Sequence, residues 1–388
     1  MSTPRKICYV ITNRIHYGRC RTLLEALKAH PDIILQIVVA GSAVLPKYGD
    51  VLTALQQDGF SADAVLFTSI EGGNHISMAK STGLSTIEFS STFQNLKPDI
   101  VILRGDRFEV LAGAIAASYL NIPIAHIEGG DVSGTLDESV RHAITKLSHI
   151  HFPTNEKSAD RLRAMGERPD MIFNVGSLDI EFVESVKQLP LDPTEALHLT
   201  GTGIKIDLQK PFLMVLQHPV TTEIEADRQA METFEAVRAI NLPTIWFWPN
   251  PDAGTEKFSK VLRHQHETKP DLLIRFIRHL SPEIFIRLLQ QTKVLIGNSS
   301  AGIKEASYLG VPTVQIGSRQ NQRFSAGYHA ILTDYERNEI KQAIEKQLQA
   351  ERPTPNLYYY RPDSSKRMVE ILRTSPLYTQ KKFYEGTA

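Results

Sequence analysis

Acidic side chains gather in three short segments of the first half of the chain, and the first two follow apolar runs directly. The segments are residues 104–109 (RGDRFE), 128–131 (EGGD) and 133–142 (SGTLDESVRH). Each alone has an ordinary structural explanation, because Asp is a common N-cap, Gly-Gly is a common turn, and an acid four residues before an arginine is a common surface pair. Three acidic segments converging on one sheet edge instead favour a functional site.

A different pattern lies in the second half, where the apolar run 294–297 leads into residues 298–302 (NSSAG) and then a predicted helix that contains Glu305. A strand that delivers small hydroxyls and free backbone N–H groups to a helix N-terminus suits a phosphate. The alternative is a serine N-cap with nothing bound. His218 follows another apolar run, and beside a phosphate it would serve as a cation or hydrogen-bond donor.

The elements that must position these residues alternate as short apolar runs and longer amphipathic segments. Strands that are apolar throughout, separated by helices, predict parallel sheets covered on both faces. We therefore expect an α/β protein with two doubly wound, Rossmann-like domains facing a cleft, with ligands at the carboxyl ends of both sheets. The predicted strands are residues 6–11, 33–39, 100–103, 122–127, 149–152, 212–216, 244–248, 272–277, 294–297 and 313–316. The predicted helices are residues 22–27, 108–120, 137–146, 156–165, 225–240 and one that begins at Ser281-Pro282.

Domain boundaries follow from where this pattern fades. We expect an N-terminal domain over residues 1–180, a linker region over 181–210 that is rich in Pro, Gly and Thr, a C-terminal domain over 211–362, and a closing helix or tail over 363–388.

Composition excludes several classes of protein. The 388 residues contain 43 Lys and Arg against 43 Asp and Glu, so nothing points to a nucleic-acid-binding surface. Two cysteines exclude a disulfide scaffold, and no metal-ligand constellation, Walker lysine pattern or GxGxxG fingerprint is present. No apolar run is long enough to span a bilayer, and the first residues do not read as a signal peptide. We expect a cytoplasmic protein without nucleic-acid or membrane partners.

Taken together, the motifs resemble those of the hydrolysing UDP-N-acetylglucosamine 2-epimerases, the first enzymes of sialic-acid synthesis. The resemblance runs from residue 6 to about residue 335, and that family is similar in fold to two-domain glycosyltransferases of the GT-B type. The matching segments are residues 105–109, 126–130, 133–135, 137–142, 145–149, 218–223, 249–250, 252–254, 297–305 and 317–320.

The resemblance implies that the second domain binds UDP and that the first domain holds the sugar. It assigns catalytic carboxylates to Asp106, Glu128 and Asp137, and gives His218 a part in the departure of the diphosphate. Glu305 would bind the ribose hydroxyls. The other substrate-binding residues that it implies are Arg14, Arg107, Arg141, His142, Asn250, Ser299, Ser300, Gly302 and Arg319. The family also suggests a homodimer or a dimer of dimers.

The chemistry explains why several carboxylates are needed and no cofactor is. Loss of UDP develops positive charge at carbon 1 of the sugar, which makes the proton on carbon 2 acidic. Loss of both groups gives 2-acetamidoglucal, and water then adds with hydrogen on the opposite face, which yields N-acetylmannosamine (ManNAc). Base and acid are not assigned individually, although position favours Asp106 and Glu128 for the elimination and Asp137 for the water.

Two departures from the family pattern leave the sugar open. His16 stands where the family has an acidic residue, and Ala43 stands where it commonly has a histidine. The alternatives are a hydrolysing epimerase of UDP-2,4-diacetamido-trideoxyglucose of the legionaminic-acid type, a non-hydrolysing epimerase, a GT-B glycosyltransferase, and a nucleotide-sugar sensor without turnover.

Overall fold

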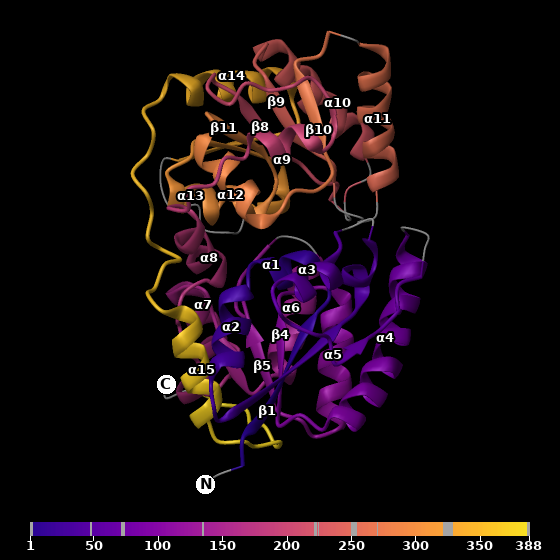
Figure 1. Ribbon diagram of the computed structural model, residues 1–388, viewed down its shortest axis with the longest axis vertical. Helices are drawn as coiled ribbons and strands as arrows, with labels where there is room; N and C mark the ends of the chain where they lie inside the picture. Colours follow the sequence, from indigo (N-terminus) through magenta and orange to yellow (C-terminus); the bar gives the residue numbers. More distant parts are fainter. Residues whose placement is uncertain are drawn as a thin grey trace. The chain divides into compact units, whose positions relative to one another are not determined.

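The chain folds into two compact α/β units (Figure 1). The computed structural model describes residues 3–46, 49–70, 74–133, 136–220, 223, 225–249, 254–269, 271–320 and 329–385. The first unit is built from Met1–Val132, Leu136–Phe182 and Tyr359–Ala388, and the second from Val183–Tyr358. No helix among the described residues is long and apolar enough to cross a membrane.

A six-stranded parallel sheet forms the centre of the first unit, in the order β3-β2-β1-β4-β5-β6. The strands are β1 (Arg5–Ile11), β2 (Ile33–Val39), β3 (Ala64–Val65), β4 (Ile100–Arg104), β5 (Ile124–Ile127) and β6 (Ile150–Phe152). Because the chain starts in the middle of the sheet and winds outward in both directions, the carboxyl ends of β1, β4 and β5 lie side by side.

Helices cover both faces of this sheet, as the uniformly apolar strands predict. Ile7 and Tyr9 of β1 pack on the face covered by α2 (Arg21–Ala29), α3 (Val51–Gln57) and α15 (Ser364–Thr374). Cys8 and Val10 pack on the other face, against α4 (His75–Leu96), α5 (Phe108–Tyr119) and α6 (Leu136–Leu147). The remaining helices of this unit are α1 (Arg14–Gly18), α7 (Glu156–Ala164) and the first part of α8 (Leu178–Val186).

The second unit has a seven-stranded sheet in the order β13-β12-β11-β8-β9-β10-β7. It is parallel except for β7, which runs antiparallel to β10. The strands are β7 (Thr202–Gly203), β8 (Leu213–Leu216), β9 (Thr244–Phe247), β10 (Ile274–Ile277), β11 (Val294–Gly297), β12 (Thr313–Ile316) and β13 (Ala330–Thr333). The helices are α9 (Thr194–Leu199), α10 (Ala226–Ile240), α11 (Thr255–Thr268), α12 (Pro282–Gln291), α13 (Glu305–Leu309) and α14 (Arg337–Gln349).

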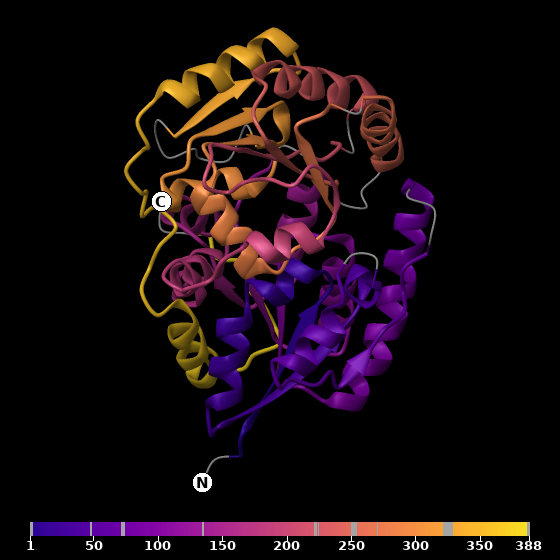
Figure 2. The same ribbon diagram turned by 45° about the horizontal axis from the view of Figure 1, so that its top comes forward.

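One face of the second sheet is covered by α10, α11 and α14, which contribute Phe234, Phe258 and Ile340 to its core. Figure 2 shows these helices along one side of the sheet. The strand order again places the carboxyl ends of β8, β11 and β12 next to one another.

Both Rossmann-like sheets and every predicted strand and helix are confirmed, with ends that shift by one or two residues. The helix predicted to begin at Ser281-Pro282 has Ser281 as its N-cap, since the side chain of Ser281 accepts a hydrogen bond from the amide of Ile284 at 3.3 Å. The boundary between the units falls inside α8, and the region expected as a linker contains α9 and β7. The C-terminal segment returns to the first unit, where Met368 and Leu372 of α15 pack near Leu24 of α2.

Candidate functional site

The first unit gathers its polar candidates at the carboxyl ends of β1, β4 and β5. Asp106 is the second residue after β4 and Glu128 is the first residue after β5, and neither strand has an exposed position. Gly105 turns the chain out of β4 with φ +78°, a conformation that a residue with a Cβ adopts only with strain. The Gly105 carbonyl lies 2.9 Å from Nε2 of His126, which is buried and fixes this turn from the neighbouring strand.

Asp106 forms an ion pair with Arg141 of α6. The guanidinium of Arg141 is only 1 % exposed and also donates to the backbone carbonyl of Asp131 at 2.9 Å. Asp131 is held in turn by the hydroxyls of Ser158 and Thr154, at 2.6 and 3.1 Å. These contacts hold the Asp106 carboxylate in place, and the predicted contact of Arg141 with the substrate stays a prediction.

Glu128 forms an ion pair with a second buried arginine, Arg104. Nη2 of Arg104 lies 3.2 Å from Oε1 of Glu128, and Nε lies 3.4 Å from Oε2. Nη2 also lies 2.5 Å from the carboxylate of Asp179 in α8. Glu128 has φ +70°, which is uncommon for a residue with a side chain.

His16 of α1, the helix that follows β1, lies beside the same turn. A Cβ built on Gly105 would lie 3.6 Å from Nε2 of His16 and 3.8 Å from Oε2 of Glu128, so the imidazole and the carboxylate border the same turn. Burial, and next the positive charge of Arg104, lower the pKa of His16 to about 3. The ring is therefore neutral at physiological pH, and it contacts Thr12 and Asn13 at 3.2 Å each. The acid of the family pattern is thus replaced by an uncharged donor and acceptor.

The other predicted residues of this unit have different surroundings. Arg107 forms an ion pair with Glu109, 3.1 Å apart, and Glu109 is almost fully buried. His142 lies 3.9 Å from Glu138 one turn earlier, and burial lowers its pKa. Burial also lowers the pKa of Arg14, to about 10, which leaves it a cation at neutral pH.

Asp137 lies in the first turn of α6 and is partly exposed. Among the described residues it has no ion-pair or hydrogen-bond partner, whereas Asp106 and Glu128 each have a buried arginine.

Asn298 organises the candidate site of the second unit, at the ends of β8 and β11. Its side-chain oxygen accepts from the amide of His218 and its side-chain nitrogen donates to the carbonyl of His218, both at 2.8 Å. Gln320, which follows β12, donates to the carbonyl of Asn298 at 3.0 Å. Three adjacent strand ends are thereby joined through fully buried Asn298, and His218, Ser299 and Arg319 are brought to one sheet edge.

The expected helix N-terminus after β11 is shorter than the sequence suggested. Residues 300–302 form a 3₁₀ turn, and α13 is only five residues long. The amides of Gly302 and Ile303 already donate to the carbonyls of Ser299 and Ser300, at 3.1 and 3.0 Å. A phosphate would therefore rely on the half-buried Ser299 and Ser300 hydroxyls more than on a helix dipole.

Gly302 is required by packing, because a Cβ there would approach the side-chain nitrogen of Gln315 to 2.0 Å. Glu305 is fully buried within the unit, so its predicted contact with a ribose stays a prediction. Arg319 lies in a short turn after β12 and is partly exposed. The predicted residue Asn250 lies outside the described residues.

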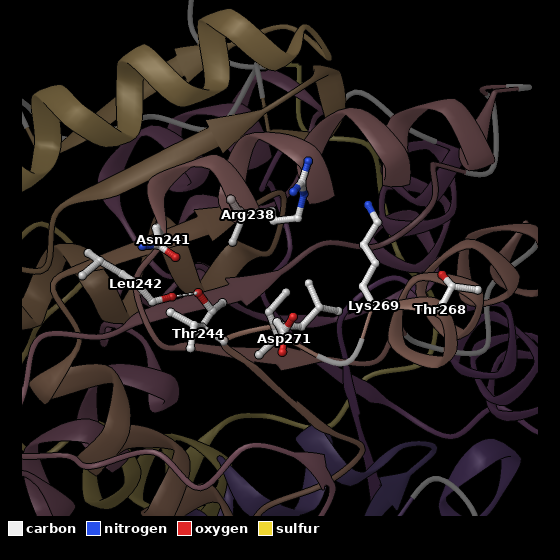
Figure 3. A pocket seen from close by; sticks show the side chains of 11 residues that line it. Arg238, Asn241, Leu242, Thr244, Thr268, Lys269 and Asp271 are labelled. Carbon is white, nitrogen blue, oxygen red and sulfur yellow. Dashed lines mark hydrogen bonds between the residues drawn. The ribbon is translucent and has the colours of Figure 1, made fainter.

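A cavity of about 470 Å³ lies in the second unit, away from these residues, at the amino ends of β9 and β10 (Figure 3). Its two cations, Arg238 and Lys269, lie 2.6 and 2.8 Å from the carboxylate of Glu235. Ligands of open α/β sheets bind at the carboxyl ends of the strands, so this cavity lies at the wrong edge for the site.

Several residues of the two sites were not among the predicted site residues. Arg104 gives a signal, since a charge at the end of a wholly apolar strand needs a partner. Asp179 gives none, because 75 residues separate it from Arg104. Asn298 stands inside a recognised segment, but nothing in the sequence shows that its amide joins β11 to β8.

Two Rossmann-like units with polar residues at the carboxyl ends of their central strands define an α/β protein of the GT-B type. A family model described as UDP-N-acetylglucosamine 2-epimerase matches residues 25–373, and the chain belongs to this family.

Curated relatives cover nearly the whole chain. A UDP-N,N'-diacetylbacillosamine 2-epimerase (hydrolyzing) of Legionella pneumophila is 36% identical over 97% of both chains. A UDP-N-acetylglucosamine 2-epimerase of Neisseria meningitidis is 34% identical over 88% of this chain and 87% of the relative. The solved structure of Methanocaldococcus jannaschii UDP-GlcNAc 2-epimerase in complex with UDP-GlcNAc and UDP has a TM-score of 0.78, with 19% identity over 95% of this chain and 99% of the other. The chain is therefore an epimerase by family, and the likeness in structure supports the fold.

Proposed function

We propose that the chain is a hydrolysing 2-epimerase of a UDP-2-acetamido sugar, which releases UDP and the free 2-epimer. The observation that carries the proposal is the pair of carboxylates at adjacent strand ends, Asp106 and Glu128, each held by its own buried arginine. An arginine beside a carboxylate favours its ionised form and fixes its orientation. Two fixed carboxylates suit a reaction in which positive charge develops on the sugar and a proton leaves carbon 2.

In the proposed reaction, the bond between carbon 1 and the diphosphate oxygen breaks, and UDP leaves with the electron pair. A carboxylate of the pair Asp106 and Glu128 takes the proton from carbon 2, which gives the glycal. Water then adds its hydroxyl to carbon 1 while a proton is delivered to carbon 2 from the opposite face. Asp137, without a described partner, is the group best suited to exchange a proton with this water.

In this proposal, residues of the second unit stabilise the departing diphosphate. His218 is held by Asn298 through both its backbone amide and its carbonyl, so its position is fixed by a neutral partner. Ser299 and Ser300 offer hydroxyls, and Arg319 offers a cation that compensates the charge of the leaving group. Glu305 and Asn250 are proposed to complete the nucleotide site, together with Arg14 and Arg107 from the first unit.

The position of bond cleavage tests the reaction class. The enzyme is incubated with UDP-GlcNAc in water enriched in oxygen-18, and the released UDP is analysed by mass spectrometry. Cleavage between carbon 1 and oxygen leaves UDP without the label, whereas attack on phosphorus introduces one labelled atom. Labelled UDP would contradict the elimination, and return of UDP-ManNAc without free UDP would indicate the non-hydrolysing reaction.

The sugar is the second question, and the 36% identical relative favours UDP-N,N'-diacetylbacillosamine as an alternative to UDP-GlcNAc. The two relatives differ by two points of identity, so identity does not choose between them. A competition assay with both UDP-sugars at equal concentration gives the ratio of the two kcat/KM values directly. We expect His16→Asp to change this ratio by about tenfold, because a charge replaces a neutral ring beside the Gly105 turn.

A further inference from the structure

We propose that Arg104 is a positioning residue of the active site, which fixes the Glu128 carboxylate and is itself fixed by Asp179. This inference rests on the proposed function, because it is there that Glu128 acts on the sugar. Nothing in the sequence motifs singles out the pair formed by Arg104 and Asp179.

The geometry of the contact shows how Arg104 would act. Arg104 is the last residue of β4 and is 3% exposed, and two of its nitrogens reach the two different oxygens of Glu128, at 3.2 and 3.4 Å. A planar guanidinium that contacts both oxygens fixes the rotation of the carboxylate as well as its position. A lysine in this place would supply a charge but only one direction of contact.

The guanidinium of Arg104 is also held by residues other than Glu128. Nη2 lies 2.5 Å from Asp179, and Nη1 lies 3.1 Å from the sulfur of Cys20. Arg19 lies 3.6 Å from the same Asp179 carboxylate. Burial by itself would lower the pKa of Arg104, but Asp179 raises it, so the guanidinium stays charged. Removing one member of such a buried set strongly destabilises the folded protein, because a buried charge is then left without its partner.

Few of the described titratable groups around Glu128 carry a charge near pH 7. The titratable groups described as interacting with it are Arg104 of β4, Tyr9 of β1, His16 of α1, Arg19 after α1 and His126 of β5, with Asp179 of α8 and Cys20 next to Arg104. Burial lowers the pKa of both histidines and raises the pKa of both Tyr9 and Cys20, so these four are neutral near pH 7. Arg104, Arg19 and Asp179 remain as the charges of this set.

Three variants test the proposal through the pH dependence of kcat between pH 4.5 and 9. Arg104→Met removes the cation beside Glu128, so we expect kcat at pH 7 to fall at least about 100-fold and the acidic half-activity point to move up by about one pH unit or more. Asp179→Asn removes an anion instead, so its acidic half-activity point should stay or move down. A merely structural role would lower kcat in both variants without moving these points in different directions, and that result would overturn the proposal.

Arg104→Lys keeps the test decisive if Arg104→Met does not fold. The retained charge should leave the acidic half-activity point within about half a unit of the wild-type value, while loss of the contact to both oxygens lowers kcat about tenfold. Wild-type kcat in Arg104→Lys would contradict the positioning role.

A measurement without turnover separates this inference from the proposed function. Protein labelled with carbon-13 at the glutamate side-chain carboxyl is titrated by NMR, and Glu128→Gln identifies the resonance of Glu128. The Glu128 midpoint should be at least about one unit higher in Arg104→Met than in wild type. If wild type releases no UDP from either UDP-sugar, the proposed function fails. If the midpoint does not move, the role of Arg104 fails.

Discussion

The candidate site of each unit lies at the carboxyl ends of its central strands, but the frameworks of the two sites differ in charge. In the first unit, buried arginines hold the candidate carboxylates, as Arg141 does for Asp106 and Arg104 for Glu128. In the second unit, the strand ends are joined by neutral amides, with Asn298 bonded to the backbone of His218. The difference teaches what each framework is suited to: ion pairs fix the protonation state of groups that exchange protons, whereas neutral amides position groups beside an anion without adding a charge.

The largest effect should come from breaking an ion pair of the first unit. Asp106→Asn keeps the shape but removes the charge, so we expect kcat to fall about 1,000-fold, within the range for general acid–base groups, with UDP affinity unchanged within about threefold. Steady-state kinetics and calorimetric titration with UDP measure the two quantities. Asp170→Asn, an exposed aspartate paired with Arg168, is the matched control. A kcat close to the wild-type value in Asp106→Asn would show that this carboxylate takes no part in the reaction.

Breaking the neutral framework of the second unit should act on binding. Asn298→Ala leaves the amide and carbonyl of His218 without their partners, so we expect UDP to bind about 10- to 100-fold more weakly. The free energy of unfolding should fall by about 1–3 kcal/mol, as for other buried unsatisfied groups. Titration with UDP and urea denaturation check both effects. Unchanged UDP affinity in folded Asn298→Ala would contradict the claim that this neutral framework positions the groups that bind UDP.

Single contacts to the nucleotide should have smaller effects. Ser299→Ala and Arg319→Ala are each expected to weaken UDP binding about tenfold, which corresponds to about 1.4 kcal/mol. Because these residues are proposed to bind the nucleotide and not to exchange protons with the sugar, turnover at saturating substrate should fall much less than in Asp106→Asn. A loss of kcat without a loss of UDP affinity would assign them to the chemistry instead.

The neutral histidines of the first unit predict a pH dependence of stability. His16 has a folded-state pKa of about 3 and His126 of about 4, both below the ordinary value of 6.5. The unfolded chain therefore binds protons that the folded chain does not, and stability that is complete above pH 6.5 is lost as the pH falls below it. Between pH 6.5 and 5.5, His16→Gln should reduce this loss by about 1 kcal/mol. Urea unfolding of the variant and wild type at both pH values measures the difference, and equal losses would contradict a neutral buried His16.

The cavity at the amino ends of β9 and β10 should contribute least to activity. Lys269→Ala removes a cation that pairs with Glu235 and lies far along the strands from Asn298. We expect kcat/KM to change less than about twofold, because ligands bind at the carboxyl ends of such strands. A tenfold loss would show that this cavity takes part in function.

Much of the fold could be predicted because buried parallel strands are uniformly apolar, as in residues 100–103 and 294–297. The helix α4 was missed, since residues 75–96 are rich in Ser and Thr and contain Gly83, so they lack a clear apolar period. Its start shows a signal in hindsight, because Asn74 and Ser77 form a capping box.

The site was predicted as a set of segments, but the partners inside it were not. Asp106 and Glu128 could be found because they follow apolar strands. The contacts of Arg104 with Asp179 and of Asn298 with His218 join residues that are 75 and 80 positions apart. Such contacts depend on strand order and on the packing of α8, which no local pattern encodes.

The most direct test of the account is the fate of the hydrogen on carbon 2. The enzyme is incubated with each UDP-sugar in deuterated water, and the products are followed by proton NMR. The account predicts free UDP together with a free 2-epimer that carries deuterium at carbon 2. Release of a sugar that retains its original hydrogen, or of one with unchanged configuration at carbon 2, would contradict it.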